Sequence, residues 1–189
     1  MARAGLTPDR VTAAGLELAD DLGFDNVTLS VLARHFGVKT ASLYSHISDA
    51  EDLKTRIVLR ALDELADLAS QAIAGRSGKE ALAALGGVYR DYARDHPGRY
   101  AATHHRLDSE AAFASAGPRH TRMVRAILRG YDIEGTEATH AVRLLGSVFD
   151  GYASLELGGA FDHSEPGSEE SWERAMDALD SLLRNWPAP

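Results

Sequence analysis

Cysteine is absent from the 189 residues of the sequence. This absence excludes disulfides, thiol catalysis and cysteine-ligated zinc or iron–sulfur sites, and it weakly favours a reducing compartment. The sequence also lacks an apolar run of about eighteen residues, so no membrane-spanning helix is predicted. Its first ten residues, MARAGLTPDR, lack the apolar core of a signal peptide, and we therefore expect a cytoplasmic protein with no membrane partner.

Strand signals are missing as well, because no stretch alternates between apolar and polar residues and no Asn-Gly hairpin turn occurs. Apolar residues recur instead at helical spacing, as at Val11, Ala14, Leu18 and Leu22. The pattern predicts an all-α chain of about nine helices. The clearest of them span residues 11–22, 28–36, 39–47, 49–72, 82–96, 123–131, 138–157 and 172–186. A flexible connection, GGAFDHSEPGSEES, is expected before the last helix.

Acidic residues outnumber basic ones, and the formal net charge is −8. A uniformly acidic protein would repel a polyanion such as DNA. The acidic residues are unevenly distributed, however, because residues 26–48 contain none. The same window contains Arg34, His35, Lys39 and His46, so a surface that attracts nucleic acid is expected there.

The acid-free window has the pattern of two short helices joined by a tight turn. Thr28 is a candidate N-cap, Ala33 is small enough for close helix approach, and Gly37 permits the positive φ of a turn. A helix-turn-helix of this kind places the start of its second helix in the DNA major groove, while Leu43 and Ile47 point inward. The expected contacts to bases and phosphates come from Lys39, Thr40, Ala41, Ser42, Tyr44 and His46.

The stretch VTLSVLARHFGVKTASLYSHISDAEDL resembles the DNA-binding segment of the TetR family of bacterial transcriptional regulators. The resemblance rests on Thr28, Ala33, Gly37-Val38 and Leu43-Tyr44-x-His46, and it adds Thr28 to the expected DNA contacts. An N-terminal arm containing Arg3 could also reach a minor groove.

Two of the positions that depart from the family pattern in this segment concern expected DNA contacts. Ala50 stands where the family usually has a lysine just after the cap of the fourth helix, which removes one expected phosphate contact. Lys54 would lie a further turn along that helix. Lys39 stands where a serine normally opens the recognition helix, and it replaces a helix cap with a charge.

The C-terminal stretch GSVFDGYASLELGGAF is similar to the WHG-type ligand-binding domain of some TetR members, with Asp150 where that domain's histidine is expected. Together the resemblances imply a three-helix DNA-binding domain at residues 1–48 and a larger helical domain for ligand binding and dimerisation at 49–189, linked through the long fourth helix. They imply a homodimeric repressor that binds a palindromic operator in double-stranded DNA and is released by a small organic effector. No cofactor is expected.

Aromatic side chains with a few polar tips gather on the middle helices, as they do in pockets for small organic ligands. Core packing is the preferred interpretation of any single one of them, so the pocket as a whole follows from the resemblance. The residues assigned to it are Tyr89, Tyr92, His96, Tyr100, His104, Phe113, Met123, Phe149, Asp150 and Tyr152. The histidines match no metal-ligand spacing, and no metal site is expected.

The last two helices are expected to form the four-helix bundle through which TetR members dimerise. Apolar residues of the last helix step by four, three and four positions and make a seam that a partner could cover. The small residues Gly146 and Ala153 would allow close helix approach. The residues assigned to the interface are Leu145, Trp172, Met176, Leu179 and Leu183.

Two other functions stay open at this point. A dimeric ligand-binding protein that no longer binds an operator would also have this pattern, and Ala50 is the observation in its favour. An enzyme using the histidines and carboxylates of the pocket is the second alternative. No nucleophile elbow, glycine-rich phosphate loop or metal motif supports it, so the chain is not expected to be an enzyme.

Overall fold

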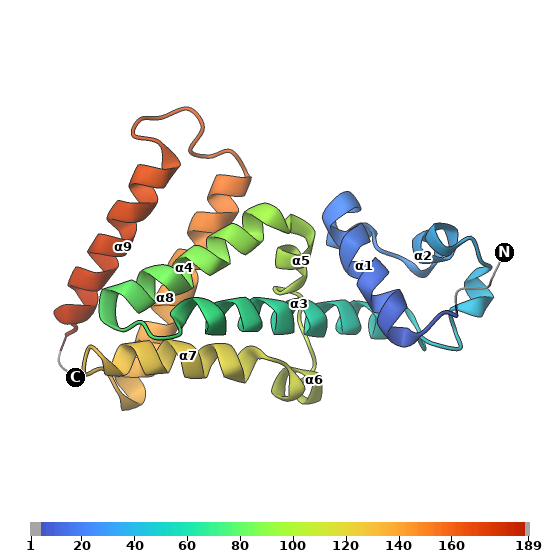
Figure 1. Ribbon diagram of the computed structural model, residues 1–189, viewed down its shortest axis with the longest axis horizontal. Coiled ribbons are helices and arrows are strands. Elements are labelled where there is room, and N and C mark those ends of the chain that lie inside the picture. Colours follow the sequence, from blue (N-terminus) through green and yellow to red (C-terminus); the bar gives the residue numbers. More distant parts are fainter. Residues whose placement is uncertain (1–4, 188–189) are drawn as a thin grey trace. The chain divides into compact units, whose positions relative to one another are not determined.

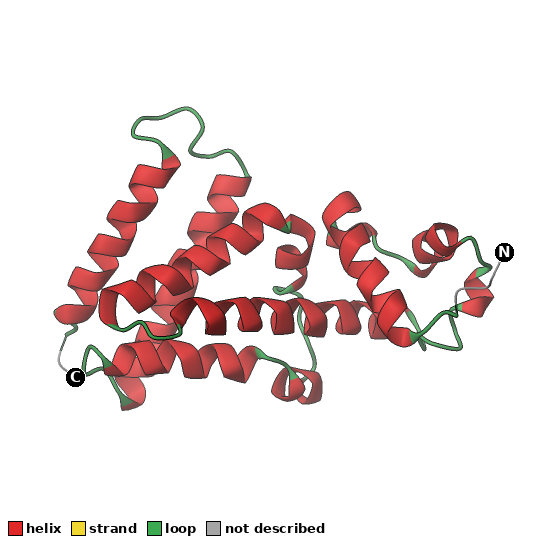
Figure 2. Ribbon diagram, viewed as in Figure 1, coloured by secondary structure: helices red, strands yellow, loops and turns green. Residues whose placement is uncertain are grey.

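The computed structural model describes residues 5–187, so Arg3 lies outside the described residues. Within this range the chain has nine α-helices, two short 3₁₀ helices and no strand, which confirms the all-α prediction (Figure 2). The elements are α1 (Pro8–Leu22), η1 (Phe24–Asn26), α2 (Leu29–Phe36), η2 (Thr40–Ser42), α3 (Ala50–Ile73), α4 (Gly78–Asp95), α5 (Pro97–Ala102), α6 (Ser109–Ala114), α7 (Gly117–Arg129), α8 (Gly135–Leu157) and α9 (Ser168–Arg184).

The described chain divides into two compact units, each with its own apolar core. Unit 1 comprises the residues up to Glu64 together with His96–Ser115. Unit 2 comprises Leu65–Asp95 together with the residues from Ala116 onward. Helix α3 begins in unit 1 and ends in unit 2, and it can be followed as one continuous helix in Figure 1.

The first helices of unit 1 begin and end where local signals predict. Thr7 caps α1 by accepting a hydrogen bond from the Arg10 amide, and Gly23 ends the helix with a φ of 86°. Thr28 caps α2 through a 3.2 Å bond from the Val31 amide. Gly37 then adopts the left-handed conformation, with a φ of 65°, that a side chain would disfavour. These caps confirm the predicted end of the first helix and the predicted limits of the second, whereas the first helix begins at Pro8, three residues before the predicted start.

Helix α3 starts with a reciprocal capping arrangement. Asp49 accepts a 2.8 Å hydrogen bond from the Asp52 amide, and the Asp52 carboxylate accepts one of 2.8 Å from the Ser48 amide. The core of unit 1 is built from side chains of α1, α2, the segment after Gly37 and the first part of α3. They include Val11, Leu32, Leu43, Ile47, Leu53 and Ile57, which are fully buried.

Helices α5 and α6 have no counterpart among the helices predicted individually from the sequence. Pro97 ends α4, as expected, but it also occupies the first turn of α5, where its missing N–H costs nothing. Helix α5 packs against α1, and Ala102 is buried in the core of unit 1. The chain therefore returns to unit 1 after α4.

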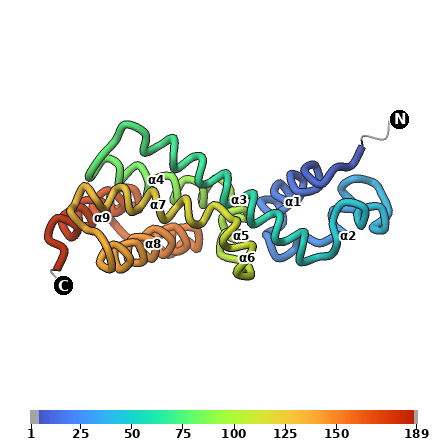
Figure 3. The backbone as a smooth tube through the Cα atoms, turned by 90° about the horizontal axis from the view of Figure 1, so that it is seen from below, coloured from blue at the N-terminus to red at the C-terminus, as the bar shows by residue number. Residues whose placement is uncertain are grey.

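Unit 2 is organised around α4, which packs against α7, α8 and α9 (Figures 1 and 3). Close approach is possible because Gly86 has no side chain: an added Cβ would lie 2.9 Å from a ring carbon of Phe149 and 3.0 Å from one of Trp172. None of the helices in the described range combines the length and apolar character needed to span a membrane.

Candidate nucleic-acid interface and effector core

The segment after Gly37 is helical but tighter and shorter than the predicted helix of residues 39–47. Its regular part is the single 3₁₀ turn η2, and one further turn follows, in which the Ile47 amide donates to the Leu43 carbonyl over 3.0 Å. The Ser45 hydroxyl donates a 3.0 Å hydrogen bond to the Ser42 carbonyl. This local bond competes with the backbone hydrogen bonds of a regular α-helix. Leu43 and Ile47 are buried, as predicted, and they fix this recognition segment, residues 39–47, on unit 1.

Most of the predicted DNA contacts lie on the solvent side of the recognition segment. Lys39, Ala41, Ser42 and Tyr44 are exposed, whereas Thr40 and His46 are half-buried. Tyr44 is 55 % exposed although its neighbour Leu43 is fully buried. Thr28 is exposed at the start of α2 while its hydroxyl caps the helix.

Lys54 is turned toward the interior of unit 1. Its ammonium donates to the Phe24 carbonyl and lies 3.9 Å from the centre of the Phe24 ring. Burial lowers the pKa of Lys54. Lys54 therefore does not compensate for the lysine that Ala50 replaces. Within the acid-free window, the side chains of Arg34 and Lys39 are exposed.

A polar pair is enclosed in unit 2. The hydroxyl of Tyr89 on α4 and Nδ1 of His120 on α7 are 2.7 Å apart, and His120 is buried. Burial raises the pKa of Tyr89 well above its usual range, so the phenol stays protonated. The Phe149 ring lies 5.9 Å from the Tyr89 ring, centre to centre, and Met123 packs on the same core.

A second polar group links three helices of unit 2. The Arg90 guanidinium on α4 donates to both carboxylate oxygens of Glu156 on α8, over 2.7 and 2.6 Å, and to Glu169 on α9 over 2.7 Å. It also lies over the rings of Tyr152 and Trp172. The Arg90 hydrogen bonds hold the pKa of Glu156 below its ordinary value.

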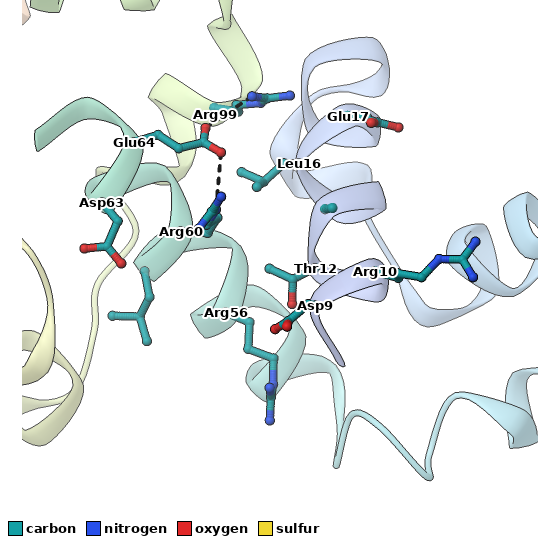
Figure 4. A pocket seen from close by; sticks show the side chains of 12 residues that line it. Asp9, Arg10, Thr12, Leu16, Glu17, Arg56, Arg60, Asp63, Glu64 and Arg99 are labelled. Atoms are coloured by element: carbon teal, nitrogen blue, oxygen red, sulfur yellow. Dashed lines mark hydrogen bonds and ion pairs between the residues drawn. The ribbon is translucent and has the colours of Figure 1, made fainter. Parts of the chain in front are cut away.

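Unit 1 contains a surface groove of about 760 Å³ between α1 and the part of α3 from Arg56 to Glu64 (Figure 4). Its charged lining is balanced: Arg10, Arg56, Arg60 and Arg99 stand against Asp9, Glu17, Asp63 and Glu64. Arg60 pairs with Glu64 at 3.4 Å across one turn of α3, as the dashed line in Figure 4 shows. A smaller groove of about 550 Å³ in unit 2 is lined by Tyr131, Glu137 and Trp186, among others.

The comparisons with known proteins agree with this arrangement. A family model described as the tetracyclin repressor-like C-terminal domain matches residues 82–179. The uncharacterized HTH-type transcriptional regulator Rv0681 of Mycobacterium tuberculosis is 33 % identical over 163 residues, which cover 84 % of this chain and 74 % of the relative. The chain belongs to the TetR family of transcriptional regulators.

Solved structures share the fold of this TetR-family regulator. A TetR variant from Acinetobacter baumannii AYE, crystallised in complex with minocycline, has a TM-score of 0.72 at 16 % identity, with 98 % of this chain and 100 % of that chain covered. The structure of BioQ with its natural double-stranded DNA operator has a TM-score of 0.67 at 20 % identity, with 95 % and 99 % covered.

The structure of this TetR-family chain divides the ten residues assigned to an effector pocket between the two units. Tyr89, Tyr92, Met123, Phe149, Asp150 and Tyr152 belong to unit 2, whereas His96, Tyr100, His104 and Phe113 belong to unit 1. The Tyr100 and His104 rings stack edge to face at 5.0 Å. Phe113 is 83 % exposed because the six-residue helix α6 directs it to solvent, so the expectation of an interior position for it is wrong.

The five side chains assigned to a dimer interface are buried within the single chain. Leu145, Trp172, Met176, Leu179 and Leu183 all belong to the core of unit 2. The physical reason is that α4 packs against both α8 and α9 and covers the apolar stripe that the sequence leaves without a partner. Exposed apolar residues on these two helices are instead Leu155, Leu157 and Leu182.

Two residues that organise unit 2 could not be predicted from the sequence. The carboxylates that pair with Arg90 are not at helical spacing from it, and no sequence pattern connects His120 to its partner Tyr89. Within residues 5–187 no three His, Asp or Glu side chains converge in a way that could hold a metal ion.

Proposed function

We propose that this TetR-family regulator is a repressor that binds a palindromic operator as a homodimer and that a small organic effector releases it from DNA. The proposal assigns DNA binding to residues 1–48 and effector binding and dimerisation to residues 49–189. The observation that carries it is the recognition segment, where Lys39, Ala41, Ser42 and Tyr44 face solvent in a stretch without a single carboxylate.

The proposed contacts follow from the chemistry of each side chain. Lys39 and His46 donate to phosphate oxygens, and Thr28 does so from the start of α2. Thr40 and Ser42 reach base edges in the major groove, while Ala41 and Tyr44 contact apolar groups such as the thymine methyl. BioQ, a structural neighbour, was solved on its DNA operator, which supports this use of the fold.

The homodimer is proposed to form on the outward faces of α8 and α9. Leu155, Leu157 and Leu182 expose apolar surface there, and Gly151 lies one turn before Leu155 with open space where a side chain would be. A two-fold dimer would present two recognition segments to successive major grooves, about 34–36 Å apart.

The effector is proposed to bind in unit 2 beside the Tyr89–His120 pair. A half-buried phenol and a buried imidazole among aromatic rings suit a flat, mostly apolar molecule with one hydrogen-bonding group. A related TetR variant was crystallised with minocycline, which supports effector binding by this fold. Release requires the effector to bind the conformation with low DNA affinity more tightly than the one with high affinity.

A dimeric ligand-binding protein without an operator is the second candidate. The position of Lys54 favours it. The Lys54 ammonium binds the carbonyl and the ring of Phe24, so no lysine at the N-terminus of α3 can contact a phosphate. The acidic residues Asp49, Glu51 and Asp52 also surround that helix start.

The deciding experiment is selection of random duplex DNA by the purified protein at two salt concentrations. An enriched palindrome with half-sites about one helical turn apart is the expected result. The matched comparison is Tyr44→Ala, which should weaken binding of the selected duplex while leaving the dimer intact. No enrichment at low salt by folded, dimeric protein would refute operator binding and favour the second candidate.

A further inference from the structure

The start of α9 covers the buried guanidinium of Arg90 with an exposed carboxylate. Arg90 is 5 % exposed, and Glu156 accepts from its Nε and Nη2 over 2.7 and 2.6 Å. The other terminal nitrogen, Nη1, donates to Glu169 over 2.7 Å. The Glu169 side chain is 70 % exposed, so water competes for this bond from the carboxylate side. An ion pair of this kind contributes little to stability, and a carboxylate from outside the chain can replace it.

Aromatic rings surround the same guanidinium. Its Cζ lies 5.8 Å from the centre of the Tyr152 ring and 5.5 Å from that of Trp172. Those two rings meet at 4.8 Å, centre to centre. Phe161, in the connection between α8 and α9, packs against the other partner of Arg90, with its ring centre 5.0 Å from that of Tyr152. Arg90 is therefore a cation with rings beside it, an environment that suits an aromatic anion.

The connection between α8 and α9 is held near its two ends (Figure 1). Residues 162–167 are all exposed, whereas Phe161 and Ser168 on either side of them are half-buried. The Tyr152 hydroxyl donates to the Ser168 carbonyl over 2.5 Å, and Glu169 follows with its bond to Arg90. The connection thus brings one aromatic ring and one carboxylate to the group formed by Tyr152 and Arg90.

A row of ring contacts joins this group to the Tyr89–His120 pair. The Tyr89 ring lies 5.7 Å from that of His120 and 5.9 Å from that of Phe149, centre to centre. The Phe149 ring lies 6.1 Å from that of Trp172, beside which Arg90 is buried. The hydrogen-bonded pair and the guanidinium therefore lie at the two ends of one aromatic row in unit 2.

We propose that the effector is an aromatic carboxylic acid and that Phe161 and Glu169 stand in its place when it is absent. One guanidinium faces two carboxylates, so an incoming acid displaces one of them, and Glu169 is the more exposed. The carboxylate of the acid then accepts from Nη1 of Arg90 in a charge-assisted hydrogen bond, while Glu156 keeps the guanidinium oriented. The ring of the acid packs on Tyr152 in place of Phe161. This inference rests on the proposed function, in which unit 2 binds an effector, and it names the chemical class of that effector.

The test uses phenylacetate as the probe and phenylacetamide as its uncharged match. Each compound is titrated into the full-length protein at constant ionic strength and without DNA. Tryptophan fluorescence reports binding, because Trp172 lies beside Arg90. The proteins compared are the wild type, Glu169→Gln, Phe161→Ala and the matched control Glu170→Gln, which alters the neighbouring exposed carboxylate.

Removal of either stand-in should improve binding of the acid. Glu169→Gln should bind phenylacetate about fivefold more tightly than the wild type, which is the most that an exposed competing ion pair contributes. Phe161→Ala should also bind it more tightly, whereas Glu170→Gln should match the wild type. Glu169→Gln should bind phenylacetamide roughly tenfold more weakly than phenylacetate, because the amide makes no charge-assisted hydrogen bond. Arg90→Met, once circular dichroism shows it to be folded, should bind the acid and the amide equally.

Three results would overturn the proposal: equal affinity of Glu169→Gln and Glu170→Gln for phenylacetate, an amide that binds as tightly as the acid, and no binding of phenylacetate to Glu169→Gln. These titrations contain no DNA, so their result does not depend on operator binding. A protein that binds the acid in the expected pattern but selects no duplex would refute the repressor and leave the Arg90 site in place. The two failures are therefore distinguishable.

Discussion

Removal of Arg90 should destabilise unit 2 far more than removal of either of its acidic partners. The Arg90 side chain is 5 % exposed, whereas that of Glu156 is 21 % exposed and that of Glu169 is 70 % exposed. Breaking a buried ion pair by deleting one partner costs about 3–5 kcal/mol, because the remaining charge is left without compensation. For Arg90→Met we expect about 3 kcal/mol, at the low end of that range, because Glu156 keeps some contact with water.

The same geometry ranks the other variants. Glu169→Gln should cost less than about 1 kcal/mol, since its pair with Arg90 is exposed on the carboxylate side. The cost of Glu156→Gln should lie between those of Glu169→Gln and Arg90→Met. The double variant Arg90→Met with Glu156→Gln should cost less than the sum of the two single changes, because both remove the same interaction.

Urea unfolding followed by tryptophan fluorescence is the suitable assay. Both tryptophans, Trp172 and Trp186, belong to unit 2, so the signal reports that unit alone. Far-ultraviolet circular dichroism recorded in parallel follows both units. Equal costs for Arg90→Met and Glu169→Gln, or a cost below about 1 kcal/mol for Arg90→Met, would refute the reasoning that burial makes this pair important.

Three further predictions follow from the contacts above. Acidification should destabilise unit 2 as the pH falls below 4.5, the ordinary pKa of a glutamate, and through the lowered pKa of Glu156. A carboxylate with a lowered pKa stabilises the folded state above that pH range, and the stabilisation is lost below it. Arg90→Met should make this loss shallower in the same fluorescence assay. Gly98→Ala should lower the thermal stability of unit 1 by more than about 2 kcal/mol, because its Cβ would meet the Ala19 backbone. Gly87→Ala, whose Cβ meets nothing within 4 Å in the interior of α4, should be neutral or stabilising, and similar losses in both would contradict the close-approach argument. Lys39→Gln should reduce the slope of log affinity against log salt concentration by about 0.9 for each half-site, as measured by fluorescence titration of the selected duplex, and an unchanged slope would mean that Lys39 makes no phosphate contact.

The sequence alone determined the elements whose ends depend on neighbouring residues. Caps and turns act within three or four positions, so Thr28, Gly37 and the Asp49–Asp52 pair were sufficient to predict α2, the turn and the start of α3. The recognition segment followed from the same local signals, together with the acid-free window, and the family followed from its motif. Only its conformation differed, because a segment anchored by Leu43 and Ile47 alone forms a single 3₁₀ turn and one further turn.

Tertiary structure decided what covers each apolar face and where each charged side chain finds a partner. Periodicity identifies the stripe of Trp172 and Met176 as apolar. The same stripe could be covered by a partner subunit or by another helix of the chain, and periodicity does not distinguish the two. In the structure, α4 covers it. The partners of Arg90 are 66 and 79 residues away, and Asp20 meets Arg99 across 79 residues. Such pairings depend on how helices pack, which no local sequence signal encodes.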